Sequence, residues 1–147
     1  MKKIALGCDH AAYEMKETVK RLLLSQNFDV IDVGTHSAES VDYPDYAKKV
    51  SHEVITGNIQ GILLCGSGIG VSMAANRYKG IRAALCRSPK DAEMSRRHNN
   101  ANVLCIGARF NTEEEIISII KTWFESSFEG GRHAERLNQF SDLGENC

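Results

Sequence analysis

The chain has 147 residues, of which 42% are hydrophobic and 25% are charged, and its formal net charge is -1. This length allows one domain with a sizeable core, and the composition is that of a globular protein rather than a disordered one. The balanced charge gives no reason to expect nucleic acid or an anionic membrane surface as a partner.

Short apolar runs alternate with longer amphipathic stretches along the chain. The apolar runs predict parallel strands over 4–8, 28–33, 61–65, 81–86 and 103–106. The amphipathic stretches predict helices over 11–25, 46–56, 71–78, 89–98 and 113–124, with Ser88-Pro89 and Asn111-Thr112-Glu113 as helix starts. This alternation predicts an α/β fold: a Rossmann-like three-layer sandwich with a five-stranded parallel sheet.

The tail over 127–147 falls outside this alternation. A Gly130-Gly131 break precedes a short helical pattern over 132–140. We expect a single domain over 1–147 whose tail helix packs on a partner subunit.

The cysteines stand at positions 8, 65, 86, 105 and 147, without a Cys-x-x-Cys pair. An odd number at scattered positions is typical of reduced thiols, and the spacing is not that of a metal finger. The apolar run after Lys3 is shorter than the roughly 7–15 residues of an export signal, and no run approaches the ~20 residues of a membrane span. We therefore expect a cytoplasmic protein without a membrane partner.

The strongest local motif is Cys65-Gly66-Ser67-Gly68-Ile69-Gly70, which directly follows a buried strand. In open α/β sheets, ligands bind beyond the carboxyl ends of the strands. Alternating glycines let backbone N–H groups close on an anion, and the next helix adds the positive end of its dipole. The loop therefore predicts a site for a phosphate or a developing oxyanion. Cys65 itself is either a small buried hydrophobe or a thiol activated by this loop.

Spacing separates this loop from other anion-binding motifs. A P-loop needs a Gly-Lys pair that the loop lacks, and a dinucleotide fingerprint needs glycine where Val71 or Met73 stands. A cysteine phosphatase would carry arginine at position 71. The loop therefore matches none of these three motifs.

Five motifs stand in order along the chain and carry a resemblance to a known family. They are Gly7-Cys8-Asp9-His10-Ala11, Asp42-Tyr43-Pro44, the Cys65–Gly70 loop, Ser95-Arg96-Arg97-His98-Asn99 and Glu129-Gly130-Gly131-Arg132-His133. Together they resemble, essentially end to end, the type B ribose-5-phosphate isomerases, a family that includes galactose-6-phosphate and allose-6-phosphate isomerases. The resemblance implies interconversion of ribose 5-phosphate and ribulose 5-phosphate in the pentose phosphate pathway, without metal or cofactor.

The resemblance also implies roles for individual residues. Cys65 would be the base that moves a proton between C2 and C1, and His98 would protonate the ring oxygen. The enediolate would be bound by the loop amides of Gly66, Ser67, Gly68, Ile69 and Gly70. The sugar would be lined by Asp9, His10 and Tyr43, although Asp9 also suits a helix cap near Ala11.

For the phosphate, the resemblance points to the tail. Arg132 and Arg136 are four residues apart and would form a clamp on one helix face, with Arg109 and Asn99 as further substrate contacts. His133 matches the motif but receives no role. The family's sites lie between subunits, which implies a homodimer or a dimer of dimers.

One position departs from the family pattern. Many members carry aspartate directly after the His-Asn pair, whereas this chain has Asn100. Loss of a carboxylate beside His98 would loosen the orientation of the imidazole.

Three other functions stay open. A hexose 6-phosphate isomerase belongs to the same reaction class, and a non-catalytic module could use the glycine loop to bind a phosphate ligand. A thiol-based redox or metal protein would need a second cysteine or a ligand cluster near Cys65. Substitution of Cys65 by alanine separates the isomerase from the binding module, because only the isomerase would lose its function.

Overall fold

Five parallel strands form the centre of the computed structural model, which describes residues 1–147. The strands are β1 (Lys2–Cys8), β2 (Phe28–Gly34), β3 (Gln60–Cys65), β4 (Ala83–Leu85) and β5 (Val103–Gly107). Their order across the sheet is β2-β1-β3-β5-β4, and every neighbouring pair is parallel. The chain reverses its direction across the sheet between β1 and β3, which is where open α/β sheets bind ligands.

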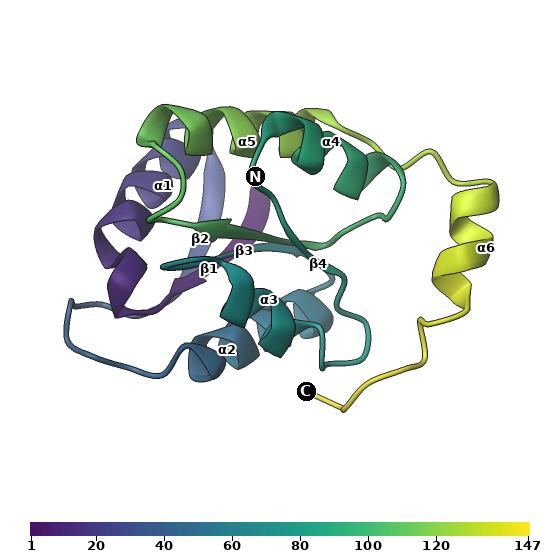
Figure 1. Cartoon of the computed structure of the whole chain (residues 1–147), viewed down its shortest axis with the longest axis horizontal. Helices are drawn as coiled ribbons and strands as arrows, with labels where there is room; N and C mark the ends of the chain where they lie inside the picture. The colour runs from purple at the N-terminus through teal and green to yellow at the C-terminus, as the bar shows by residue number, and fades with distance from the viewer.

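Helices cover both faces of this sheet, as Figure 1 shows. One face carries α1 (Tyr13–Ser25), α4 (Pro89–Arg97) and α5 (Glu113–Glu125), and the other carries α2 (Tyr43–Gly57) and α3 (Ile69–Ala75). A single 3-10 turn, η1 (His10–Ala12), joins β1 to α1. The predicted three-layer sandwich is therefore confirmed. None of the helices is long and apolar enough to cross a membrane.

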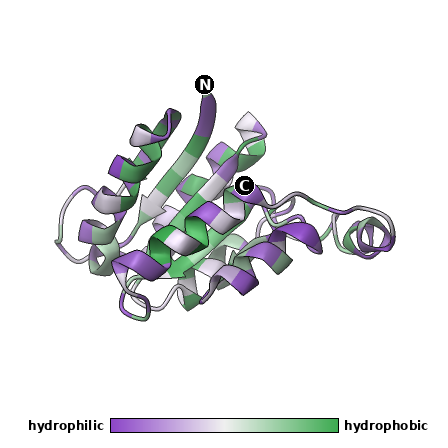
Figure 2. Ribbon diagram, turned by 90° about the horizontal axis from the view of Figure 1, so that it is seen from above, coloured by the Kyte–Doolittle hydropathy of each residue, from purple (hydrophilic) through white to green (hydrophobic).

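The strands are apolar on both faces because each face packs against a helical layer. Ile62 and Leu64 belong to the core under α1 and α5, whereas Leu63 and Cys65 point into the core under α2 and α3. Figure 2 shows this pattern as hydrophobic strands flanked by helices with polar outer surfaces. Each fully buried leucine or isoleucine contributes about 1.5–3 kcal/mol, so this two-sided core stabilises the sheet that carries the site.

The predicted helix starts before α4 and α5 are confirmed by their caps. The Ser88 hydroxyl accepts a hydrogen bond from the Asp91 N–H at 3.2 Å. Thr112 and Glu115 form a reciprocal capping box, with bonds of 3.2 and 2.9 Å.

Several elements differ from the sequence-based bounds: α2 starts three residues earlier than predicted, β1 starts two residues earlier, and β4 and α3 differ for reasons that side-chain bonds explain. Strand β4 has three residues, because the Asn102 side chain accepts the Arg82 N–H at 2.8 Å and closes a turn before the strand. Helix α3 starts at Ile69, two residues earlier than predicted, because the Ser67 hydroxyl accepts the Ile69 N–H at 3.1 Å.

The tail helix α6 (Arg132–Asn138) has no buried residue. It stands away from the sheet and its covering helices in Figures 1 and 2. The predicted helix in the tail is therefore confirmed, although it ends at Asn138 rather than at position 140.

One fully buried cation lies under the site. The Lys16 ammonium contacts both carboxylate oxygens of Asp32, at 2.9 and 2.8 Å, and the Thr35 carbonyl at 2.8 Å. Burial would raise the pKa of Asp32, but hydrogen bonds from Lys16, from the Gly34 N–H and from Lys20 outweigh it and lower the pKa. The pair fastens the start of the loop over 35–42, which leads to the site.

Candidate active site

Asp9 and Cys65 lie on neighbouring strands at the carboxyl edge of the sheet. Residue Cys8 pairs with Leu64, and the Asp9 N–H donates to the Leu64 carbonyl at 3.2 Å. The Asp9 carboxylate is nearly buried and accepts the Ala11 N–H at 3.0 Å, so it caps η1 as the sequence predicted. The capping bond fixes one carboxylate oxygen at the carboxyl end of β1, next to the strand that leads into the glycine loop.

Gly68 gives the glycine loop its shape. Its φ of 78° lies in the left-handed region, and a Cβ at this position would stand 2.6 Å from Leu85 Cδ1 and 2.8 Å from the Ile106 carbonyl carbon. A side chain is excluded by both conformation and space. With this conformation, the Gly68 N–H donates to the Cys65 sulfur at 3.1 Å.

The loop amides divide into two groups. The N–H groups of Gly68 and Ile69 bond within the loop, to the Cys65 sulfur and the Ser67 hydroxyl. The N–H groups of Gly66, Ser67 and Gly70 have no hydrogen-bond partner in the chain. The Ser67 hydroxyl accepts the Ile69 N–H, and its own O–H is still able to donate a hydrogen bond. Three amides and one hydroxyl are thus available to an anion at this loop.

The environment of Cys65 differs from that of the other sheet cysteines. Burial raises the pKa of the Cys8 thiol to about 12 and that of the Cys86 thiol to about 11, and it raises the pKa of Cys105 well above its ordinary value. These three thiols are core residues, as predicted. Cys65 is also largely buried, yet its sulfur accepts an N–H bond at the mouth of a loop with free amides, a setting that the other three thiols lack.

Three further predicted residues surround this loop. The Tyr43 ring, which is 41% exposed, lies against Gly70, where a Cβ would come within 2.6 Å of the ring. His10 Nδ1 accepts the Val41 N–H at 3.1 Å, so the neutral imidazole carries its proton on Nε2. The Arg109 N–H donates to the Gly66 carbonyl at 3.0 Å, and its guanidinium lies beside Gly66.

His98 lies near the amino ends of the strands, opposite the end that carries Cys65. It is the residue that follows α4, and this helix runs antiparallel to the strands from the carboxyl end of β4. The following residues meet the amino ends of β4 and β5, where the Asn100 carbonyl accepts the Arg82 Nε at 2.9 Å and Asn102 bonds to Arg82. Strand β3 alone spans roughly 17 Å at ~3.3 Å per residue. A single chain therefore brings together Cys65, Asp9, His10, Tyr43 and Arg109 but keeps His98 and Asn99 apart from them.

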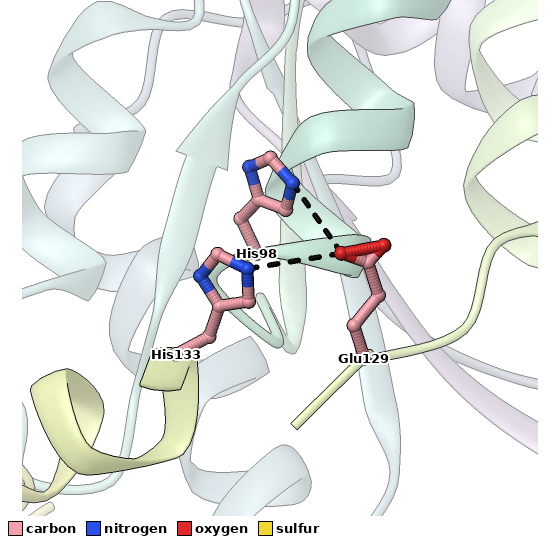
Figure 3. Close-up of side chains that lie close together, drawn as sticks. All are labelled: His98, Glu129 and His133. Atoms are coloured by element: carbon pink, nitrogen blue, oxygen red, sulfur yellow. Dashed lines mark ion pairs between the residues drawn. The ribbon is translucent and has the colours of Figure 1, made fainter. Parts of the chain in front are cut away.

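Two residues that received no role from the sequence surround His98. Its ring stacks on that of His133 with centroids 4.4 Å apart and an interplanar angle of 13°. Figure 3 shows both rings facing the Glu129 carboxylate. Oxygen Oε1 lies 3.5 Å from His98 Nε2 and 3.7 Å from His133 Nε2. The only sequence signal was the four-residue spacing of Glu129 and His133 in the tail motif.

Arg97 holds Glu129 in this position. Its Nε and Nη2 donate to Oε2 at 3.1 and 2.8 Å, and the Glu129 N–H donates to the Arg97 carbonyl at 3.0 Å. The hydrogen bond from Arg97 lowers the pKa of Glu129. Burial, together with the charges of His98 and Arg132, lowers the pKa of His133. Near neutral pH the group therefore consists of a carboxylate and a neutral His133.

The structure also explains the departure at Asn100. The residue adopts a left-handed conformation with φ 45°, and its side-chain oxygen accepts Arg96 Nη1 at 3.2 Å. Its side chain therefore faces Arg96 rather than His98. The carboxylate that faces His98 comes from Glu129 instead.

The tail arginines stand at the same end of the molecule as His98. Arg132 is the first residue of α6, Arg136 lies in its last turn, and both side chains are exposed. A cavity of about 730 Å³ opens between the tail and α4; it includes Asn99, Arg82 and Phe140 but not Cys65. This cavity thus lies away from the glycine loop.

Comparison with known proteins places this geometry in a family. The model of the Ribose/Galactose Isomerase family matches residues 4–140. Ribose-5-phosphate isomerase B of Escherichia coli K12 is 45% identical over 144 residues, which is 97% of each chain. A ribose 5-phosphate isomerase structure from Thermotoga maritima is 50% identical, with a TM-score of 0.93 over 95% of this chain and 97% of that one.

A solved relative also contains a sugar phosphate. The structure of ribose-5-phosphate isomerase B from Mycoplasma genitalium with bound ribulose-5-phosphate is 40% identical, with a TM-score of 0.92 over 95% of this chain and 93% of that one. The match extends over nearly the whole chain, at high identity, in sequence and in structure. The chain therefore belongs to the Ribose/Galactose Isomerase family.

Proposed function

We propose that this chain is an aldose–ketose isomerase that interconverts ribose 5-phosphate and ribulose 5-phosphate. The observation that carries the proposal is the Cys65 thiol, which receives an N–H bond beside three free loop amides in a chain of this family. The relative with bound ribulose-5-phosphate supports the choice of a pentose. We further propose that the enzyme is cytoplasmic and acts in the pentose phosphate pathway.

In the proposed reaction, the Cys65 thiolate removes the C2 proton of the open-chain aldose. The electron pair moves into a C1–C2 double bond, and the carbonyl oxygen becomes the enediolate oxyanion. The free amides of Gly66, Ser67 and Gly70 stabilise this charge, and each such donor contributes about 2.7–4 kcal/mol. The O2 hydroxyl proton then passes to O1. As the C2–O2 carbonyl forms, the thiol returns its proton to C1, which yields the ketose. No metal or cofactor enters these steps.

Ring opening requires an acid, and we assign it to His98. Its imidazole would donate a proton to the furanose ring oxygen as the C1–O bond breaks. Within one chain, Cys65 lies at the carboxyl ends of the strands and His98 lies near their amino ends. We therefore propose that each active site takes Cys65 from one subunit and His98 from the other. The enzyme would then be a homodimer or a dimer of dimers.

The exposed tail supports this arrangement. Helix α6 buries no residue in its own chain, so we propose that residues 127–147 pack on the partner and bring Arg132 and Arg136 to the substrate phosphate. Asn99 would accompany them, and Arg109 would reach the substrate from the Cys65 side. Two arginines at this spacing suit a dianion, because each charge-assisted hydrogen bond contributes about 1.5–3 kcal/mol.

Proton NMR in D2O tests the proposed function. The purified protein is incubated with ribose 5-phosphate or allose 6-phosphate in the presence of EDTA. We expect conversion of the pentose and deuterium exchange at C2, loss of both in Cys65→Ala, and retention in the control Cys147→Ala, whose half-buried thiol lies at the end of the chain. Turnover of allose 6-phosphate alone would move the function to a hexose 6-phosphate, and no exchange with either sugar would refute the isomerase.

A further inference from the structure

Three potential metal ligands converge beside the tail. They are Nε2 of His98, Nε2 of His133 and Oε1 of Glu129, and all three atoms lie within 4.8 Å of one another. Figure 3 shows that both imidazoles direct Nε2 toward the same carboxylate oxygen. The ligands come from two distant parts of the chain: His98 from the end of α4, and Glu129 and His133 from the segment before α6 and its first turn.

The distances distinguish this cluster from a set of hydrogen bonds. The two nitrogen–oxygen separations are 3.5 and 3.7 Å, longer than the 2.7–3.2 Å of an ordinary N–H···O bond. A tetrahedral ion with ligands at about 2.0–2.1 Å spaces neighbouring donor atoms about 3.3 Å apart. The two nitrogen–oxygen separations need only a few tenths of an ångström of adjustment to match, and the two nitrogens, which lie within 4.8 Å of each other, approach by rotation of a side chain.

The surroundings already hold these ligands in orientation. Arg97 occupies Oε2 of Glu129 with two N–H groups and leaves Oε1 directed at the histidines. The two rings stack nearly parallel, and both Nε2 atoms face the Glu129 carboxylate. Such outer contacts typically orient the ligands of metal sites in proteins. The His98 side chain is 40% exposed and that of Glu129 is 37% exposed, so an ion can enter from solvent.

The chemistry of the donors indicates which ion fits. Two imidazoles and one carboxylate suit Zn²⁺ and similar late transition-metal ions, which take three protein ligands and leave a position for water. Hard ions such as Mg²⁺ and Ca²⁺ prefer sets of oxygen ligands. Arg97 and Arg132 are close cations, so they reduce the affinity of the site for any cation.

We propose that His98, Glu129 and His133 form a binding site for Zn²⁺ or a similar transition-metal ion. Metal binding here blocks the enzyme, because the ion takes the lone pair of His98 Nε2 and prevents this nitrogen from carrying the proton for ring opening. The inhibition, but not the binding, rests on the proposed function. The ion is not a cofactor of the isomerisation.

Titration of the apoprotein with ZnCl₂, followed by calorimetry, tests the binding. We expect one Zn²⁺ per chain, and at least about a 10-fold weaker affinity in His133→Gln, comparable to the loss caused by removing a supporting ligand. His52→Gln is the matched control, because His52 is exposed on α2 far from the cluster, and it should bind Zn²⁺ as the wild type does. Equal affinity in wild type and His133→Gln, or no binding by the wild type, would overturn the proposal.

The absorption spectrum of the Co²⁺-loaded protein distinguishes this site from a site in which the Cys65 thiol binds the metal. Nitrogen and oxygen ligands give visible d–d bands without a thiolate-to-cobalt charge-transfer band, and this spectrum should be unchanged in Cys65→Ser. A charge-transfer band that disappears in Cys65→Ser would overturn the assignment.

An activity assay then tests the inhibition. Zn²⁺ should slow ring opening of ribose 5-phosphate, and EDTA should restore the rate. It should leave the deuterium exchange of ribulose 5-phosphate, an open-chain ketose, largely unchanged. Inhibition that affects both reactions equally would contradict the role of His98 while the calorimetric binding result would stand by itself.

Discussion

Substitution of Gly68 by alanine tests how the glycine loop is held. The left-handed conformation costs a residue with a Cβ about 1–2 kcal/mol. The new Cβ would also stand 2.8 Å from the Ile106 carbonyl carbon and 2.9 Å from the Gly107 nitrogen, both in the backbone of β5. Overpacking of this kind costs about 1–3 kcal/mol. We expect the free energy of unfolding to fall by about 2–5 kcal/mol.

The same substitution should affect turnover through the loop. A shift of the loop that relieves the contact with β5 moves the Gly68 N–H away from the Cys65 sulfur, to which it donates at 3.1 Å. Misplacement of a catalytic group by about 1 Å can reduce the rate about 10²-fold. Turnover of ribose 5-phosphate at saturating substrate measures this effect.

Gly80→Ala is the matched control. Gly80 has a φ of 88°, similar to that of Gly68, but a Cβ there would meet only Ile55 Cγ1 at 3.9 Å. This variant should therefore show the conformational cost of about 1–2 kcal/mol without the clash and without loss of activity. Urea unfolding of both variants gives the difference. A Gly68→Ala protein as stable and as active as Gly80→Ala would refute the reasoning.

Three further outcomes follow from the structure. Asp32→Ala leaves Lys16 buried without its main partner, so we expect a loss of roughly 3 kcal/mol in urea unfolding, whereas the double variant Asp32→Ala/Lys16→Met, which leaves neither charge, should lose less; a double variant less stable than Asp32→Ala would be inconsistent with a buried, unpaired charge as the cause. The pKa of Asp32 is lower in the folded state, so its contribution to the free energy of unfolding is present above about pH 4 and is lost as the pH falls through the folded pKa, a slope that Asp32→Asn should flatten. Arg136→Ala should raise KM for ribose 5-phosphate by about 10–100-fold with a smaller change in kcat, because one charge-assisted bond contributes about 1.5–3 kcal/mol; an unchanged KM would remove this arginine from the phosphate site.

The layered fold could be predicted because its signals are local. Continuous apolar runs mark strands that are buried on both faces, and Ser88 and Thr112 cap α4 and α5 as their types suggest. The bounds of β4 and α3 could not be predicted in the same way. They depend on the side-chain bonds from Asn102 to Arg82 and from Ser67 to Ile69, which compete with strand and helix pairing.

The site could be predicted only in part, because some of its contacts depend on long-range folding rather than on a local pattern. Cys65 and Asp9 end adjacent strands, so topology alone brings them together. The contacts of His98 with Glu129 and His133 depend on the return of the tail to the end of α4, and no periodic pattern encodes that return. Because Asn100 replaces the aspartate that many family members have, the sequence alone suggests that His98 lacks a carboxylate partner. That partner is Glu129, which lies 29 positions after Asn100.

Mixing two inactive variants tests the central proposal most directly, namely that one subunit supplies Cys65 and another supplies His98. Cys65→Ala and His98→Ala are each purified, unfolded together in equal amounts and refolded, and turnover of ribose 5-phosphate is measured. In a mixed dimer, one of the two sites then combines an intact Cys65 with an intact His98. Random pairing should therefore restore about a quarter of the wild-type activity. Activity that stays at the level of the separate variants, in a sample shown to contain mixed dimers, would contradict a shared site.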